Sequence, residues 1–274
     1  GTVKLLLRLD DGETVETVLI PSESRDGIPR MTQCVSCQVG CAMACTFCAT
    51  GRMGFSRNMS MGEILGQVLL ARRYLGGTPE EPRLRNIVFM GMGEPLLNFT
   101  EVMRSLETLN DEMAFGFSPR RITVSTCGLQ KGLRELGESN LAYLAVSLHA
   151  PTQELRETLM PKAARWPLAA LMDALAGYPL KARERLTFEY LLLGGVNDRP
   201  EHARALAKLM ARVKAKLNLI VYNPVQGAPY EAPSPESVDL FAGILHEKHI
   251  TAILRKSKGQ DIKAACGQLR AEYR

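Results

Sequence analysis

The sequence predicts an α/β fold in which strands and helices alternate around a parallel sheet. Three observations support this prediction. Short apolar runs of strand length recur between residues 86 and 254, segments with helical periodicity separate them, and residues 2–20 alternate around a turn. Repeated strand–helix units place strands in parallel, so their carboxyl ends meet at one edge of the sheet. We expect functional side chains at that edge.

The expected elements can be placed in chain order. Residues 2–20 read as a β-hairpin around the Asp10-Asp11-Gly12 turn. Strands are expected at 86–91, 121–126, 142–148, 186–193, 217–222 and 250–254. Helices are expected at 60–75, 99–110, 128–137, 166–177, 200–213 and 235–248. The helix caps expected from the sequence are Ser60 with Glu63 in a capping box, Thr100, and either Ser234 or Ser237.

Composition limits the classes of protein that fit this chain. Its 274 residues, 46% hydrophobic and 23% charged, can bury one large core, and we expect an extension over 1–30 followed by a barrel over 31–274. No run of eighteen apolar residues occurs and the first residues lack a signal pattern, which predicts a soluble cytoplasmic protein without a membrane partner. Seven cysteines, crowded and odd in number, fit a reducing compartment. The net charge of +5 is a weak indication of a polyanionic partner.

Five of the seven cysteines lie between residues 34 and 48, which indicates metal ligation. Cys41, Cys45 and Cys48 form a CxxxCxxC spacing. Soft thiolates select zinc, copper(I) or iron–sulfur clusters, and three ligands leave a metal group with an open position. A closed zinc site would need a fourth ligand, which Cys34 or Cys37 could supply. An iron–sulfur cluster with an open position is favoured over this zinc site and over ordinary buried thiols.

The spacing and the small-residue loop after it resemble the cluster signature of radical S-adenosylmethionine (SAM) enzymes. The longer string TQCVSCQVGCAMACTFCATGRMGFSRN is similar to the RlmN/Cfr group of adenosine methyltransferases, and the resemblance extends from about residue 1 to residue 269. It implies a partial (β/α)6-type radical SAM barrel with an N-terminal β-hairpin extension. It also implies that Cys41, Cys45 and Cys48 hold a 4Fe-4S cluster that binds SAM. Proteins of this group usually carry a small helical N-terminal domain, which we expect to be absent here.

Two other cysteines need separate interpretation. Cys37 stands where the group usually has serine, so it is either a small buried residue or an extra thiolate offered to the cluster. Cys127 is expected in the core.

Polar residues at the ends of predicted strands are candidate SAM ligands. Gly93 and Glu94 in GMGEP resemble the GGEP-type motif that binds the SAM amino group. The residues alone leave other roles open, because a histidine at a strand end can be structural and an Asn-Pro pair can start a turn. The resemblance implies that the remaining SAM ligands are Ser125, Ser147, His149 and Asn223.

The resemblance also implies the catalytic residues. AACGQL is similar to the segment that bears a methyl-carrying cysteine, which makes Cys266 the methyl carrier and Cys34 the second catalytic thiol. Glu16 in VETVLIP matches the residue that acts as a base. A carrier thiol needs a lowered pKa to react readily. The basic residues near Cys266 in sequence are Arg255, Lys256 and Lys258.

The implied reaction methylates a ring carbon of adenosine in rRNA or tRNA. It uses two SAM molecules per turnover, one as methyl donor and one as radical source. Carbon 2 is favoured over carbon 8, with carbon 8 or another substrate as alternatives within the same class. The implied partners are RNA and an electron donor such as flavodoxin or ferredoxin, and we expect a monomer. A non-catalytic, zinc-stabilised RNA-binding module is the alternative from a different class.

Overall fold

A nine-stranded sheet organises the chain in the computed structural model, which describes residues 1–23, 27, 29–76, 83–255 and 257–270. The strand order is β1-β2-β3-β6-β7-β8-β9-β10-β11. Its strands are β1 (Val3–Arg8), β2 (Thr14–Glu23), β3 (Pro29–Cys34), β6 (Arg83–Phe89), β7 (Ile122–Thr126), β8 (Tyr143–Ser147), β9 (Leu186–Leu192), β10 (Ala215–Val221) and β11 (Ala252–Arg255). Neighbours from β3 to β11 run parallel, while β1 and β2 are antiparallel. The predicted hairpin and parallel strands are therefore confirmed.

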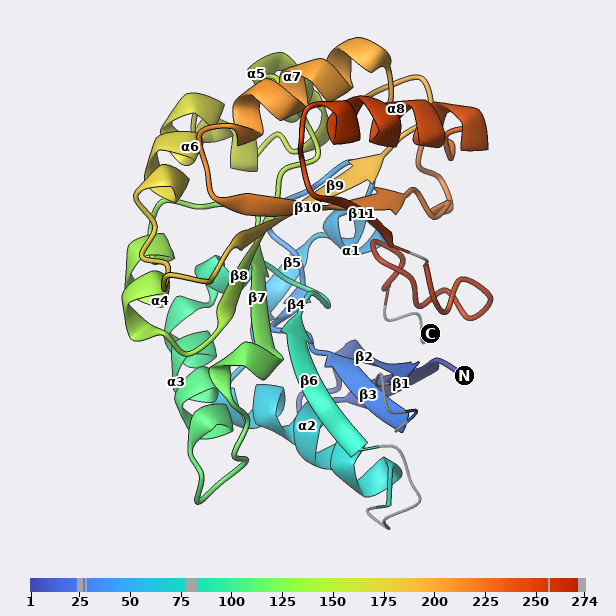
Figure 1. Ribbon diagram of the computed structural model, residues 1–274. Helices are drawn as coiled ribbons and strands as arrows, with labels where there is room; N and C mark the ends of the chain where they lie inside the picture. The colour runs from blue at the N-terminus through green and yellow to red at the C-terminus, as the bar shows by residue number, and fades with distance from the viewer. Residues whose placement is uncertain (24–26, 28, 77–82, 256, 271–274) are drawn as a thin grey trace.

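Helices cover the outer side of this curved sheet, so that the parallel strands form part of a barrel (Figure 1). They are α2 (Met61–Tyr74), α3 (Phe99–Asn110), α4 (Leu133–Ser139), α5 (Gln153–Leu159), α6 (Leu168–Ala176), α7 (Pro200–Met210) and α8 (Pro235–Glu247), while the short α1 (Ala49–Met53) belongs to the cysteine-rich segment. The described residues also form three short 3-10 helices, which are η1 (Pro95–Leu97), η2 (Pro119–Arg121) and η3 (Ala163–Arg165). All six predicted helices are present, and α1 and α5 are additional. None of the helices within the described ranges is long and apolar enough to cross a membrane.

Strand β3 joins the hairpin to the barrel, and the sequence did not predict it. It pairs antiparallel with β2 and parallel with β6. Its sequence PRMTQC is too polar for an apolar run, yet Gln33 is fully buried. The Gln33 amide donates to Thr17 Oγ1 at 3.0 Å and to the Gln67 carbonyl at 2.8 Å, which satisfies its buried nitrogen. The hairpin strands belong to the same sheet as the barrel strands, so the sheet itself marks no boundary at residue 30. The division into an extension over 1–30 and a barrel over 31–274 stays a prediction.

Two of the predicted helix caps are present. Ser60 Oγ accepts a hydrogen bond from the Glu63 amide, and the Glu63 carboxylate accepts one from the Ser60 amide. This is the reciprocal capping box expected at the start of α2. At the start of α8, Ser234 rather than Ser237 is the cap, because its hydroxyl accepts from the Ser237 amide at 3.2 Å.

The expected Thr100 cap is wrong, because α3 begins at Phe99, two residues before the start that a Thr100 cap would give. Asn98 occupies the cap position, without a capping hydrogen bond from its side chain. Its amide instead donates to the carbonyls of Cys37 at 2.8 Å and Met59 at 2.7 Å. Asn98 therefore ties the beginning of α3 to the cysteine-rich segment, a tertiary role that local helix rules do not contain.

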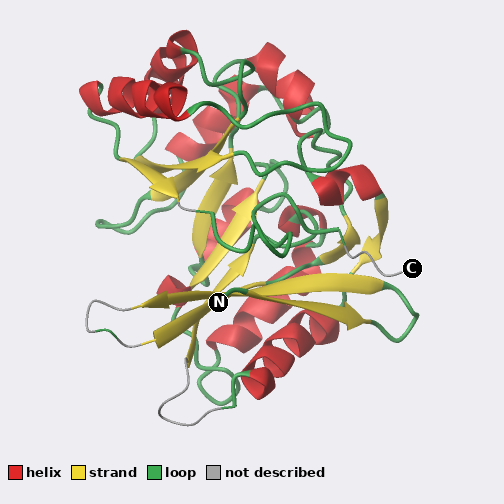
Figure 2. Cartoon of the chain, turned by 90° about the vertical axis from the view of Figure 1, so that its right-hand side faces the viewer, coloured by secondary structure: helices red, strands yellow, loops and turns green. Residues whose placement is uncertain are grey.

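The cysteine-rich segment forms a small layer of its own inside the barrel mouth. It contains the two-stranded sheet of β4 (Gln38–Gly40) and β5 (Phe55–Asn58), with α1 between them. Figure 2 shows the long hairpin strands running beside the looped segments near the C-terminus. The first and last parts of the chain thus meet at the open side of the barrel.

Candidate active site

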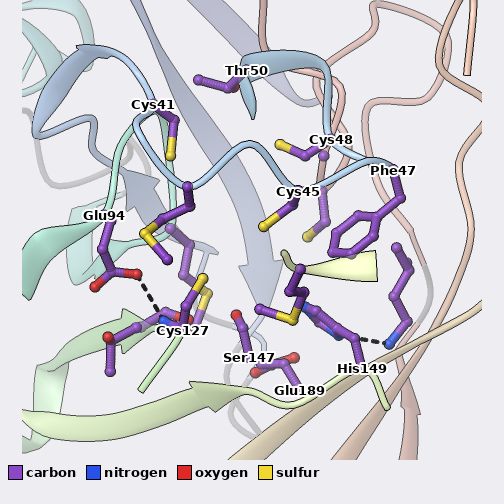
Figure 3. Close-up of a pocket in the computed structure, with 18 of the residues that line it drawn as sticks. Cys41, Cys45, Phe47, Cys48, Thr50, Glu94, Cys127, Ser147, His149 and Glu189 are labelled. Atoms are coloured by element: carbon purple, nitrogen blue, oxygen red, sulfur yellow. Dashed lines mark hydrogen bonds between the residues drawn. The ribbon is translucent and has the colours of Figure 1, made fainter. Parts of the chain in front are cut away.

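A cavity that opens to solvent lies where the parallel strands end. Nine of the residues predicted for the site line it (Figure 3). They are Cys41, Cys45, Cys48, Gly93, Glu94, Ser125, Ser147, His149 and Cys266. Glu16, Cys34 and Asn223 are not among its lining residues. The strand-end rule anticipates the position of Gly93, Glu94, Ser125, Ser147 and His149 at this cavity, while the roles of all nine residues stay predictions.

The three thiols of the CxxxCxxC motif stand along one wall of the cavity. Cys45 is buried, while Cys41 and Cys48 are half-buried, and all three are free thiols. Burial raises the pKa of Cys41 to about 12 and that of Cys48 to about 11. Among the described residues, no three His, Cys, Asp or Glu side chains converge closely enough to hold one metal ion. The thiols are therefore spaced apart at the cavity, and a metal group that binds them must displace their protons.

Cys127 is a correction to the sequence prediction, because it lies at the cavity rather than in the core. The neighbouring Cys45 thiol and burial raise the pKa of Cys127 well above its ordinary value. Cys37, in contrast, is buried in the hydrophobic core at 2% exposure. Of its two expected roles, the small buried residue is the one observed.

A buried cation, Arg156, lies beneath these thiols and was not predicted. Its guanidinium donates to the carbonyls of Leu148 at 3.1 Å and Cys127 at 2.6 Å, at the ends of β8 and β7. The residue is fully buried, and within the described residues it makes no ion pair with a carboxylate. Arg156 therefore fixes two strand ends and leaves positive charge close to groups that bind metal as anions.

The GMGEP turn brings a buried carboxylate to the cavity. Gly93 has a φ of +107°, and a Cβ at this position would come within 2.6 Å of Gln38 Cβ, so only glycine fits. Glu94 Oε2 accepts from the Cys127 amide at 2.7 Å and Oε1 from the Leu96 amide at 3.0 Å. Burial raises the pKa of Glu94, while these hydrogen bonds act in the opposite direction. The carboxylate is held rigidly at the cavity wall.

His149 presents one nitrogen to the cavity and uses the other for structure. Its Nδ1 accepts a hydrogen bond from the Leu191 amide at 3.0 Å, which leaves the proton on Nε2. Burial, with a smaller contribution from Arg156, lowers the pKa of His149 to about 3. The Phe47 ring packs edge-on against the imidazole at 5.0 Å between centroids. His149 is therefore a neutral hydrogen-bond donor at neutral pH.

The Cys266 segment is docked directly onto the cysteine-rich segment. The Ala49 amide donates to the Gly267 carbonyl at 2.8 Å, and Thr50 Oγ1 donates to the Leu269 carbonyl at 2.6 Å. Asn223 supports the same segment, since its amide nitrogen lies 3.4 Å from the Cys266 carbonyl and its Oδ1 accepts from Gln260 at 2.6 Å. Asn223 thus positions the Cys266 segment in this structure.

The two predicted catalytic thiols lie close enough to influence each other, although most of the chain separates them. Cys34 ends β3 and is 8% exposed, while Cys266 stays open to the solvent side of the cavity. Burial and the neighbouring Cys266 raise the pKa of Cys34 to about 12. Burial also raises the pKa of Cys266, with Arg255 lowering it and Glu189 raising it further. Arg255 is therefore the predicted cation beside Cys266, but burial outweighs it.

The other basic candidates contribute less to this thiol pair. Lys258 donates to the Pro21 carbonyl at 2.6 Å and so belongs to the junction with the hairpin. Lys256 lies outside the described residues.

Glu16 lies outside the main cavity, in a smaller one lined also by Lys4, Gln268 and Arg270. Its carboxylate pairs with Lys4 Nζ at 2.8 Å and accepts from the Arg270 amide at 2.8 Å. The residue is 4% exposed. Glu16 therefore connects the hairpin to the end of the Cys266 segment, and its predicted role as a base stays a proposal.

Glu189 is a cavity residue that the sequence interpretation missed. It lies on β9, between Ser147 on β8 and Asn218 on β10 in the sheet register. One oxygen accepts from Asn218 Nδ2 at 2.8 Å, whereas Oε2 is buried without a hydrogen-bond partner among the described residues. A single glutamate in the apolar run LTFEYLLL was the signal that could have revealed it.

Comparison with known proteins agrees with this geometry. Residues 35–207 match the Radical SAM superfamily. A relative from Nitratidesulfovibrio vulgaris (strain DP4), named "Dual-specificity RNA methyltransferase RlmN", is 71% identical over 272 residues, which cover 99% of this chain and 75% of the relative. The chain belongs to the RlmN family of radical SAM proteins. A relative from Lawsonia intracellularis (strain PHE/MN1-00) with the same name is 61% identical over 274 residues. The aligned region covers 100% of this chain and 76% of the relative.

A solved structure extends the RlmN family assignment to the fold. The crystal structure of a radical SAM methyltransferase from Sphaerobacter thermophilus matches with a TM-score of 0.91 and 46% identity, covering 99% of this chain and 78% of that chain. The predicted partial barrel is therefore confirmed. Family membership implies a 4Fe-4S cluster and SAM, and the residues present fit both groups. Three free thiols line the cavity, and a glycine turn, a carboxylate and a neutral imidazole face the space beside them.

Proposed function

We propose that this protein methylates a ring carbon of adenosine in RNA, with carbon 2 as the favoured position. As a member of the RlmN family it is a radical SAM RNA methyltransferase, and the ring position and the methyl-carrier mechanism are our proposal. The observation that carries it is the proximity of Cys34, at the end of β3, to Cys266, which lines the same cavity as Cys41, Cys45 and Cys48. A radical SAM enzyme that only cleaves SAM needs the three cluster thiols but no additional pair of thiols beside them.

Cys41, Cys45 and Cys48 would hold the 4Fe-4S cluster, and Gly93, Glu94 and His149 would hold SAM. When bound, these groups supply a methyl group and a 5′-deoxyadenosyl radical. The chain contributes binding and orientation. Glu94 can accept from an ammonium group, and the neutral His149 can donate from Nε2. Ser125 and Ser147 line the cavity beside them and supply hydroxyl groups.

Cys266 would carry the methyl group, because carbon 2 of adenine is not nucleophilic enough for direct transfer from SAM. Its sulfur first takes the methyl group of one SAM molecule by displacement. The radical comes from a second SAM molecule, so two are consumed per turnover. The methyl carbon gives a hydrogen atom to the 5′-deoxyadenosyl radical and, as a carbon radical, adds to the adenine ring, which links the protein covalently to the RNA. Arg255 favours the thiolate that the first step requires, against the effect of burial.

Cys34 would release the product by forming a disulfide with Cys266. The adduct radical first gives up one electron to the oxidised form of the flavodoxin- or ferredoxin-type partner. As the sulfur of Cys34 then attacks that of Cys266, the bond between Cys266 and its carbon breaks, the methylene carbon takes up a proton, and the methylated base leaves. The reduced partner later reduces the disulfide, which restores both thiols for the next turnover. A base must remove the ring proton. Glu16 is the residue we propose for this step, which requires its ion pair with Lys4 to open.

The two thiols therefore predict opposite defects. In Cys266→Ala, no methylated protein and no product should form. In Cys34→Ala, the protein should become trapped on its RNA as a covalent adduct, visible as a nuclease-sensitive shift on a denaturing gel. Normal turnover in Cys34→Ala, or adduct accumulation in Cys266→Ala, would contradict the assignment of these roles.

Nucleoside analysis identifies the product independently of the thiol variants. Total RNA incubated with reconstituted protein, reductant and SAM should yield 2-methyladenosine after digestion. An 8-methyladenosine product would assign the carbon 8 alternative. About one zinc per chain, in place of about four irons after anaerobic reconstitution, would favour the RNA-binding module instead.

The remaining partners belong to the same proposal. Reduction by flavodoxin or ferredoxin, action as a monomer, a cytoplasmic location, and rRNA or tRNA as substrate are what we expect for this reaction. Reconstitution with each purified electron donor, followed by measurement of 5′-deoxyadenosine, tests the first of them.

A further inference from the structure

Glu189 is a buried carboxylate at the Cys266 side of the cavity for which the proposed reaction has so far no use. Its side chain is 5% exposed, and it lines the cavity with Arg255 and Cys266 (Figure 3). The Asn218 amide holds Oε1 at 2.8 Å, which fixes the carboxylate plane. Oε2 has no hydrogen-bond partner within the described residues. Leaving such an acceptor unpaired is costly, so a ligand with a donor group is expected there.

Arg255 provides the complementary group beside this acceptor. Its Nη1 lies 4.0 Å from Glu189 Oε2, which is too long for a hydrogen bond, and its side chain is 40% exposed. The two groups therefore stand next to each other without satisfying each other. An acceptor beside a donor matches an edge of adenine, where the exocyclic amino group donates and a neighbouring ring nitrogen accepts.

We propose that Glu189 and Arg255 recognise the target adenine, with Glu189 accepting from its exocyclic amino group and Arg255 donating to an adjacent ring nitrogen. The inference rests on the proposed function, because it takes the ligand to be the RNA base that reacts at Cys266. It makes Glu189 a specificity-determining residue for adenine. Both groups influence the Cys266 thiol, so a base held by them lies beside the methyl carrier.

The test compares two substrates with two enzymes. The substrates are a synthetic anticodon stem-loop RNA with one unpaired adenosine at the target position and the same RNA with purine riboside, which lacks the amino group. Glu189→Gln is the variant, because its oxygen can keep the Asn218 bond while its NH2 group replaces Oε2. Glu184→Gln is the matched control, since this half-buried carboxylate accepts from the Lys181 amide just before β9, outside the cavity.

Wild-type protein and Glu184→Gln should prefer the adenosine RNA by about 10- to 100-fold in kcat/KM, as expected for a hydrogen bond to a charged group. Glu189→Gln should lose most of this preference. Removing the amino group also changes the reactivity of the ring, so the decisive quantity is the difference in preference between the two enzymes. A preference that Glu189→Gln retains would overturn the proposal.

SAM also contains an adenine, and a binding measurement separates the two sources of the amino group. SAM affinity, measured by equilibrium dialysis, should be equal in wild-type protein and Glu189→Gln. A large loss of SAM affinity in the variant would assign the amino group to SAM and overturn the proposal. If Glu189→Gln does not fold, equal wild-type rates on both RNAs would still overturn it.

Failure of the proposed function has a different outcome. In that case, neither RNA nor total RNA is methylated on adenosine by any of the proteins.

Discussion

The hydrogen bond from Thr50 to Leu269 offers a direct test of how the Cys266 segment is held. Thr50 lies in α1, directly after the cluster motif, and its hydroxyl donates to the Leu269 carbonyl at 2.6 Å. Both residues are buried, at 3% and 5% exposure. Thr50→Val keeps the shape of the side chain and removes only the donor. The Leu269 carbonyl is then left without this partner.

The expected effect follows from the cost of an unsatisfied buried carbonyl. That cost is about 1–3 kcal/mol, which corresponds to a change of about 5- to 150-fold in an equilibrium. The bond joins two segments that are distant in sequence, so we expect the cost to appear as local opening of residues 257–270 rather than as global unfolding. Amide protection in this segment should fall by the same factor, even where the docked state stays dominant.

Hydrogen exchange of peptides that cover residues 257–270 measures this opening. Thr108→Val is the control, because Thr108 makes a comparable bond to the Arg104 carbonyl on the exposed side of α3. Iron content after reconstitution should be determined for both variants, since the Thr50 hydroxyl also contacts the Cys48 thiol. Unchanged exchange in Thr50→Val, or an equal change in both variants, would refute the idea that this bond holds the segment.

Further predictions concern the cluster, the pH and salt responses, and a helix cap. Cys45→Ala should abolish 5′-deoxyadenosine formation, and full formation would exclude Cys45 as a ligand. Metal-free protein should lose stability in denaturant titrations as pH rises above about 9. In the unfolded chain the Cys34 thiol ionises near that pH, whereas in the folded protein its pKa is about 12, so the folded state keeps the proton. Equal free energies of unfolding at pH 8 and pH 10 would contradict this. RNA affinity should fall with salt, with a log–log slope of roughly −0.7 to −0.9 per phosphate contacted, and a flat response would indicate a nucleoside-sized substrate. Ser60→Ala should lower the free energy of unfolding by about 1 kcal/mol, and an unchanged midpoint would mean that the cap is not stabilising.

The sequence predicted the elements whose signal is local. Apolar runs and helical periodicity located the six parallel strands from β6 to β11 and six helices, because each buries one continuous set of side chains. Strand β3 was missed because its burial depends on partners elsewhere, as the Gln33 bonds to Thr17 and Gln67 illustrate. Helix α5 was missed as well, a short helix that carries the buried Arg156.

The site was predictable where a motif or a strand end marks a residue. The cluster spacing, the GMGEP turn and the His149 segment are all local patterns, and their residues line one cavity. Glu189 lies inside a predicted strand rather than at its end, and its position at the cavity follows from the register with β8 and β10. Cys127 directly follows the predicted strand 121–126, so the strand-end rule applied to it, but its apolar character favoured the core interpretation.

Burial affects both proposed catalytic thiols, Cys34 and Cys266, but leaves them with different reactivity. Both have raised pKa values, but Cys266 stands beside Arg255 at the open side of the cavity, whereas Cys34 is enclosed at the end of β3. Only the thiolate reacts readily, so Cys266 is the better acceptor of a methyl group and Cys34 stays protonated. A protonated Cys34 also forms a disulfide with Cys266 slowly before substrate arrives. In the proposed reaction, the thiol that must act last is therefore the one that the fold keeps least reactive.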